Sequence, residues 1–193
     1  EKMLKTKIYF AGSAKLTVDR QLQEWAYPRL MSQLNDRSLI PKWMSYYHDV
    51  NPNISIFIDS GAYSAYTKGA TIDVDAYINW INTHGDAFTV IAQVDFIPGK
   101  SNLETDAEVY LKAPQHSWEN YLYMHERLRP ELRDKLIPVF HQGEDFKWLK
   151  NMINWVDPET GRHMPYIGVS PHTEVTSANR LSFCRDVFRI IKN

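Results

Sequence analysis

The stretch ISIFIDSGAYS, residues 54–64, sets the fold class and carries the first candidate for a functional side chain. Its first half is a short apolar run rich in isoleucine, which is typical of a buried strand in a parallel sheet. The run ends in Asp59-Ser60-Gly61, where small and polar residues favour a turn. The stretch therefore predicts a buried strand over residues 54–59 that ends in a carboxylate.

Similar apolar runs recur along the chain and alternate with amphipathic stretches. We expect strands at residues 7–11, 54–59, 87–95, 136–140 and 165–169. Helical spacing of apolar residues predicts helices at 19–34, 73–84, 104–128, 145–156 and 177–191, with a break at Pro28 and an interruption around Pro114. This alternation predicts a single α/β domain over residues 1–193, with a parallel sheet and helical crossovers. Two architectures fit this alternation. Five strands could form a complete open doubly wound sheet, or they could form part of a (β/α)8 barrel, which they are too few to close.

Polar residues follow four of the expected strands, at the point where each strand ends. They are Asp59-Ser60-Gly61, Gln93-Val94-Asp95, His141-Gln142-Gly143-Glu144 and Gly168-Val169-Ser170. The carboxyl ends of parallel strands share one rim, where ligands bind in α/β folds. Carboxylates, an amide, hydroxyls and backbone groups gathered there would suit a planar heterocycle with several donors and acceptors. Asp-Ser-Gly alone is also an ordinary turn, so the hypothesis depends on the shared position of all four segments.

Composition excludes several other classes of function. The chain has a net charge of −1, so its overall charge does not indicate a nucleic-acid partner. A single cysteine, Cys184, excludes a disulfide within the chain and a zinc site built from cysteines. The single cysteine also fits the reducing cytoplasm, so we expect a cytoplasmic protein. No apolar stretch reaches the roughly 18 residues that span a bilayer, so we expect no membrane partner. Neither glycine-rich phosphate-binding motif is present.

The motifs, taken in order, resemble those of the tRNA-guanine transglycosylase family. Asp59 to Tyr63 (DSGAY) is similar to the DSGG-type motif, and Gln93-Val94-Asp95 to the next acidic strand end. Val139 to Gly143 (VFHQG) resembles the VQGG-type segment, and Gly168-Val169-Ser170, with Glu174 after it, lies where the family has a GGLAVGE-like stretch. The variant motif followed by Thr67-Lys68-Gly69 looks closest to phage and bacterial relatives that insert 7-deazaguanines into DNA.

The resemblance implies a (β/α)8 TIM barrel and the exchange of guanine for a 7-deazaguanine in DNA or tRNA. It implies that Asp59 is the catalytic acid/base residue, that Asp95 and Gln142 bind the guanine edge, and that Gly168 and Glu174 contact the base. The remaining residues of the motifs are expected to line the same pocket: Ser60, Gly61, Tyr63, Gly143 and Ser170.

The family's nucleophilic aspartate and its zinc site lie on later strands than those found here. We therefore expect the chain to carry the front part of the barrel, with about five sequential strands and outer helices, and no cofactor of its own. Ala62 replaces a glycine and Val169-Ser170-Pro171 departs from the family pattern, which leaves the identity of the base open. Two other hypotheses stay open. One is a non-catalytic partner that binds a base or a catalytic homologue, in a homo- or hetero-oligomer, and the other is an unrelated α/β enzyme with an Asp acid/base pair.

Overall fold

The computed structural model describes residues 6–12, 16–98, 107–172 and 174–192, which form a mixed α/β fold. Its strands are β1 (Arg29–Ser32), β2 (Ile56–Asp59), β3 (Val90–Ala92), β4 (Leu136–Ile137), β5 (Val139–His141) and β6 (Gly168–Ser170). Its helices are α1 (Leu16–Glu24), α2 (Ile40–Asp49), α3 (Ala62–Thr67), α4 (Val74–His84), α5 (Ala107–Arg127), α6 (Pro130–Arg133), α7 (Phe146–Asn154) and α8 (Ser177–Lys192). A short 3₁₀ turn, η1 (Gly85–Ala87), follows α4.

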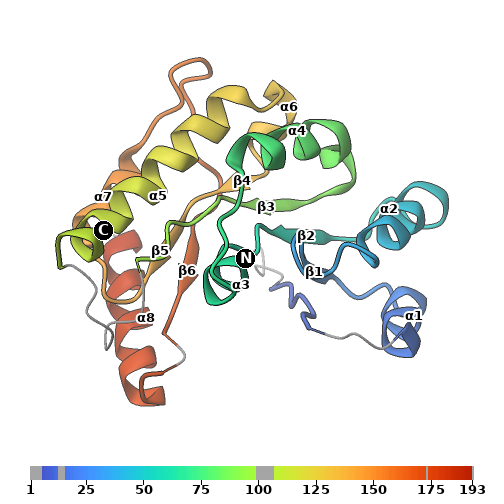
Figure 1. The fold of residues 1–193 in the computed structure, drawn as a ribbon, viewed down its shortest axis with the longest axis horizontal. Coiled ribbons are helices and arrows are strands. Elements are labelled where there is room, and N and C mark those ends of the chain that lie inside the picture. The colour runs from blue at the N-terminus through green and yellow to red at the C-terminus, as the bar shows by residue number, and fades with distance from the viewer. Residues whose placement is uncertain (1–5, 13–15, 99–106, 173, 193) are drawn as a thin grey trace.

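The strands pair in the order in which they occur along the chain. One parallel sheet has the order β1-β2-β3-β4, and β5 and β6 form a second parallel pair. Only Pro138 separates β4 from β5, so one continuous segment pairs with β3 at its start and with β6 at its end. In Figure 1, α2, α4, α5 and α7 follow one another around the outside of these strands. The expected α/β class with a parallel sheet is confirmed, while the barrel stays a prediction.

The two faces of the four-stranded sheet differ in burial. Residues paired across parallel strands point to the same face. One row across the sheet is fully buried beneath helices, namely Met31, Ile58, Ile91 and Leu136. The neighbouring row on the opposite face, Leu30, Phe57 and Val90, is only half-buried. The helices therefore cover one face of the sheet, and the other face is less protected from solvent.

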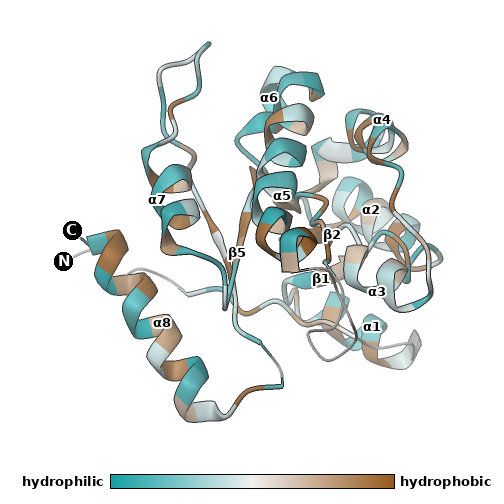
Figure 2. Cartoon of the chain, turned by 60° about the vertical axis from the view of Figure 1, so that its left-hand side comes forward, coloured by the Kyte–Doolittle hydropathy of each residue, from teal (hydrophilic) through white to brown (hydrophobic). Residues whose placement is uncertain are grey.

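A second core forms around β5 and β6. Phe140 packs there with Leu149 and Met152 of α7 and with Phe183 and Val187 of α8. Figure 2 shows α7, α8 and β5 together on one side of the molecule. Partly buried Trp118 and Met164 pack against both this core and the larger one, so the two cores are contiguous.

Three of the expected strands lie where the sequence predicts them, and the others differ. The helix expected at 19–34 is wrong beyond Glu24, because residues 29–32 form β1 and Pro28 lies immediately before it. The strand expected at 7–11 is reduced to a bridge between Phe10 and Arg29. The strand expected at 165–169 is shifted to Gly168–Ser170. Helix α2 was not expected from the sequence.

The expected interruption at Pro114 is also wrong, because α5 continues through this residue. Pro114 is buried, so packing of the helix on the core offsets the backbone hydrogen bond that proline cannot donate. The first residues of the expected helix, up to residue 106, lie outside the described residues. None of the helices in the described part is both long and apolar enough to cross a membrane.

Candidate functional site

Asp59 ends β2 and is held by the turn that follows it. The Gly61 backbone N–H donates to the Asp59 carboxylate at 2.9 Å, and the Ala62 N–H donates to the Ser60 hydroxyl at 3.3 Å. Gly61 has a φ of 82°, in the left-handed region that favours glycine. A Cβ at Gly61 would lie 2.6 Å from the Leu34 Cβ and 2.8 Å from the Ser32 hydroxyl oxygen. The DSGA segment therefore adopts a tight turn that packs against the end of β1.

The environment of Asp59 raises the pKa of its carboxyl group and so favours the protonated form. Burial raises the pKa of Asp59 above its ordinary value, and the negative charges of Asp95 and Asp36 raise it further. The hydrogen bond from Gly61 opposes this rise but does not cancel it. A carboxyl group with a raised pKa at the end of a strand is suited to general acid/base chemistry.

Tyr77 of α4 is fully buried and lies near enough to Asp59 and Asp95 for their charges to act on its hydroxyl. Its hydroxyl donates to the Ala92 carbonyl at 3.3 Å, at the end of β3. Burial raises the pKa of Tyr77 well above its ordinary value, and the charges of Asp59 and Asp95 add to this effect. Tyr77 therefore stays neutral and joins α4 to the end of β3.

Asp95, which follows β3, is held on both of its oxygens. The Gln93 side-chain amide donates to Oδ1 at 2.9 Å, and the His141 Nε2 lies 3.3 Å from Oδ2. Gln93 is fully buried, and its own side-chain oxygen has no hydrogen-bond partner among the described residues. Asp95 is thus oriented from its own strand and from β5 across the site.

His141 ends β5 and lies between two carboxylates. Its Nδ1 is 3.1 Å from Glu144 Oε1, while its Nε2 faces Asp95. Burial on its own would lower the pKa of His141, but the hydrogen bonds to Asp95 and Glu144 outweigh burial and raise it to about 10. The side chain is therefore an imidazolium across the neutral pH range.

The structure brings only some of the expected residues into this site. Gln142 is turned towards α8 instead, because its oxygen accepts from the His172 N–H at 3.0 Å and its amide donates to the Asn179 carbonyl at 3.4 Å. Gly168 and Ser170 pair with Val139 and His141 along β6. Tyr63 is exposed on α3, and Glu174 lies in an exposed turn beyond β6.

Sequence reasoning missed Glu144, Gln93 and Tyr77 as members of the site. Glu144 and Gln93 do lie within the polar segments at strand ends, which is a signal that could have singled them out. Tyr77 left no such signal, because its position in the apolar pattern of α4 is that of an ordinary core residue. In the described ranges, no three His, Cys, Asp or Glu side chains are grouped as a metal site.

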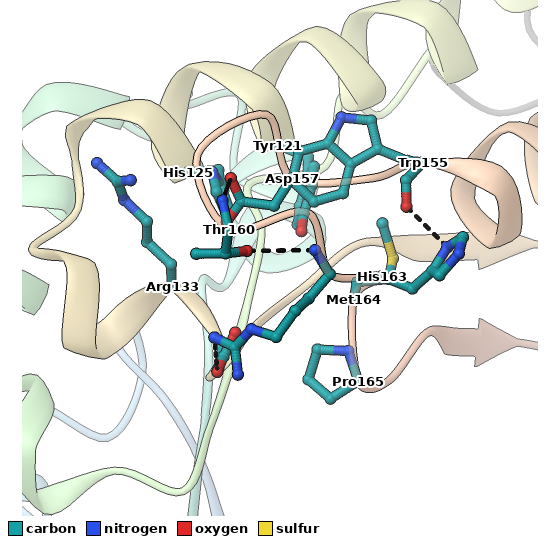
Figure 3. Close-up of a pocket in the computed structure, with 11 residues that line it drawn as sticks. Tyr121, His125, Arg133, Trp155, Asp157, Thr160, His163, Met164 and Pro165 are labelled. Carbon is teal, nitrogen blue, oxygen red and sulfur yellow. Dashed lines mark hydrogen bonds and ion pairs between the residues drawn. The ribbon is translucent and has the colours of Figure 1, made fainter.

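A pocket also lies near the other ends of the strands, beside the residues that precede β4 (Figure 3). There His125 of α5 lies 3.6 Å from Asp157 and packs edge-on against Trp155. The free volume is about 10 Å³, roughly the room that one water molecule needs. We interpret this pocket as a shallow surface feature beside a structural His–Asp pair and assign no ligand to it.

Asp59, Asp95 and the His141–Glu144 pair thus form one cluster at the carboxyl ends of three strands, which we call the rim site. It combines a protonatable carboxyl, a carboxylate fixed in orientation and a histidine cation. Comparison of the chain with protein-family models, with curated proteins and with solved structures finds no significant match.

Proposed function

We propose that the rim site binds a guanine-like base and that the chain supplies the base-binding part of a guanine/7-deazaguanine transglycosylase-like enzyme acting on DNA or tRNA. The observation that carries this proposal is the position of Asp59 and Asp95. They follow neighbouring parallel strands and lie close enough for the charge of Asp95 to raise the pKa of Asp59.

The two aspartates suit different parts of such a reaction. Asp95, held by Gln93 and His141, keeps lone pairs that can accept from the ring and exocyclic N–H groups of a guanine edge. Asp59, with its raised pKa, can give a proton to the departing base and take one from the incoming base. Displacement at C1′ would break the bond to the old base as the bond to a nucleophile forms. We assign that nucleophile to none of the described residues.

The surroundings of the site also bear on the substrate. Asp59, Asp95, Asp36 and Glu144 make the rim rich in carboxylates, which repel phosphate groups. The base would therefore have to enter the site while its phosphates stay outside. This requires a base that is flipped out of a duplex or lies in a single strand. Tyr63, exposed on α3 after the turn that follows Asp59, offers an aromatic ring on which such a base could stack.

Direct binding of free bases tests the proposal. We expect wild-type protein to bind 7-deazaguanine in calorimetric titration, and Asp95→Asn and Asp59→Asn to bind it more weakly. The matched control is Asp49→Asn, at the exposed end of α2 away from the rim site. Incorporation of labelled guanine into DNA and into tRNA then measures exchange. Absence of binding by folded wild-type protein would overturn the proposal, and binding without exchange would favour a non-catalytic base-binding partner.

A further inference from the structure

We propose that His141 is a positioning residue for the rim site, held between Asp95 and Glu144 so that it fixes the Asp95 carboxylate towards the N–H donors of the bound base. This inference rests on the proposed function and adds to it a role for His141, to which the resemblance assigns no contact with the base. The resemblance assigns base contact to the neighbouring residue, Gln142, whose side chain is bonded elsewhere.

Both nitrogens of the His141 imidazole ring face a carboxylate oxygen. His141 Nδ1 lies 3.1 Å from Glu144 Oε1, and Nε2 lies 3.3 Å from Asp95 Oδ2. Ionised carboxylates only accept hydrogen bonds, so a ring that satisfies both of them must donate from both nitrogens. His141 therefore acts as a cation with both N–H groups engaged. It has no free N–H for the substrate, which makes it a positioning residue.

A turn from His141 to Glu144 holds the ring in place. Glu144 Oε2 accepts from the His141 backbone N–H at 3.1 Å while Oε1 faces the ring, so one carboxylate holds both ends of the residue. The Glu144 N–H donates back to the His141 carbonyl at 3.2 Å, and Gly143 between them has a φ of 98°. The sequence His-Gln-Gly-Glu thus forms a closed turn that needs glycine at its third position.

The charged groups around the His141 ring are mainly carboxylates. Asp95 and Glu144 contact it directly, while Asp59 and neutral Tyr77 are near enough to Asp95 to interact with its charge. The surroundings are therefore anionic, and the pKa of His141 rises to about 10 although burial opposes the rise. Asp95 receives donors from Gln93 on one oxygen and from His141 on the other. Its orientation is set before a ligand arrives, which is the condition for reading a donor-rich edge.

The test combines NMR titration of the free protein with base binding by variants. His141→Gln removes the cation, Glu144→Gln weakens the turn without touching Asp95, and exposed His48→Gln is the matched control. We expect His141→Gln to weaken 7-deazaguanine binding by about 10-fold to 100-fold, the loss of one charge-assisted hydrogen bond. We expect a smaller loss for Glu144→Gln and none for His48→Gln.

The pH profile separates positioning from a merely structural effect. Wild-type binding should be flat between about pH 6 and 8, where an ordinary histidine loses its charge. Loss of the Glu144 charge lowers the pKa of His141, so binding by Glu144→Gln should weaken as the pH rises, whereas His141→Gln has no ring to titrate and should bind weakly at every pH in this range. Ring signals of His141 that titrate at the ordinary histidine value would overturn the inference. Variant binding that matches wild type at every pH would also overturn it and leave the proposed function intact, whereas no binding by wild type would overturn the proposed function itself.

Discussion

The turn after Asp59 needs a glycine at position 61 for two reasons, its positive φ and its close contact with neighbouring residues. Its φ of 82° is unfavourable for residues with a side chain, and a Cβ there would meet Leu34 and Ser32 at distances below 3.0 Å. We predict that Gly61→Ala lowers the free energy of unfolding by about 2–4 kcal/mol, since backbone strain and overpacking add. Urea denaturation measures this loss.

Gly69→Ala is the matched control for that prediction. Gly69 also has a positive φ, 69°, but a Cβ there would meet nothing within 4 Å. We expect this control to cost only the backbone strain, about 1–2 kcal/mol. Equal losses at the two positions would show that Gly61 is needed for its φ alone and that the close approach to β1 does not matter.

The charge of His141 should make stability depend on pH. Its pKa is about 10 in the folded protein, against about 6.5 for an unfolded histidine. Between these values the folded state keeps a proton that the unfolded state releases, so stability is full below about pH 6.5 and falls as the pH rises. The slope is at most about 1.4 kcal/mol per pH unit. We predict that denaturation between about pH 7 and 9 shows this fall in wild type and that His141→Gln abolishes it; parallel curves would contradict the ion cluster.

The aspartates of the site could be predicted from sequence, whereas the geometry around them could not. Asp59 and Asp95 each follow a readable apolar run, so strand ends alone placed them on one rim. The choice between His141 and Gln142 depends on the backbone at Gly143, whose φ of 98° turns the chain and returns Glu144 to the His141 ring. No periodicity in the sequence encodes that turn.

Among the elements, β1 and α1 depend on a buried ion pair that sequence patterns conceal. Arg29 is fully buried in β1, where its Nε donates to Asp19 of α1 at 3.0 Å. The Trp43 indole N–H of α2 donates to the same Asp19 oxygen at 3.2 Å. Because arginine is rarely buried, residues 29–32 did not read as a strand, and the helical pattern was extended across them.

We predict that breaking this pair destabilises the whole β1 region. Arg29→Met leaves the Asp19 charge buried without its cation, which should lower the free energy of unfolding by about 3–5 kcal/mol. The double variant Arg29→Met/Asp19→Asn removes the charge and keeps an acceptor for Trp43, so it should be more stable than the single variant. Thermal and urea unfolding measure both, and a double variant no better than the single one would contradict an electrostatic cause.

At the scale of the whole molecule, the sequence predicts the order of the strands. It does not predict which face of the sheet the helices cover. Strand–helix alternation with crossovers predicts neighbouring strands in chain order, and β1 to β4 follow that order. The sequence does not show which face is open, because apolar residues occur on both. Leu30, Phe57 and Val90 are as apolar as the buried row behind them and yet are half-buried.

The last prediction concerns the edge of the sheet at β6. Within the described residues β6 pairs with β5 alone. The Gly168 N–H donates to the Pro138 carbonyl and the Ser170 carbonyl accepts from the Gln142 N–H, so the N–H and C=O of Val169 between them point to the other edge. A free strand edge favours association with a further strand. We therefore predict that the isolated chain self-associates as its concentration rises.

Val169→Pro removes the outward N–H without touching the hydrogen bonds of Gly168 and Ser170, so it should shift the protein towards monomer. Val169→Thr, which keeps the N–H and the branched shape, is the matched control and should behave as wild type does. Sedimentation velocity over a range of concentrations measures the association, and circular dichroism checks that the fold is kept. A wild-type chain that stays monomeric at every concentration, or a proline variant that associates as strongly as the threonine one, would show that β6 is not the edge through which the chain associates.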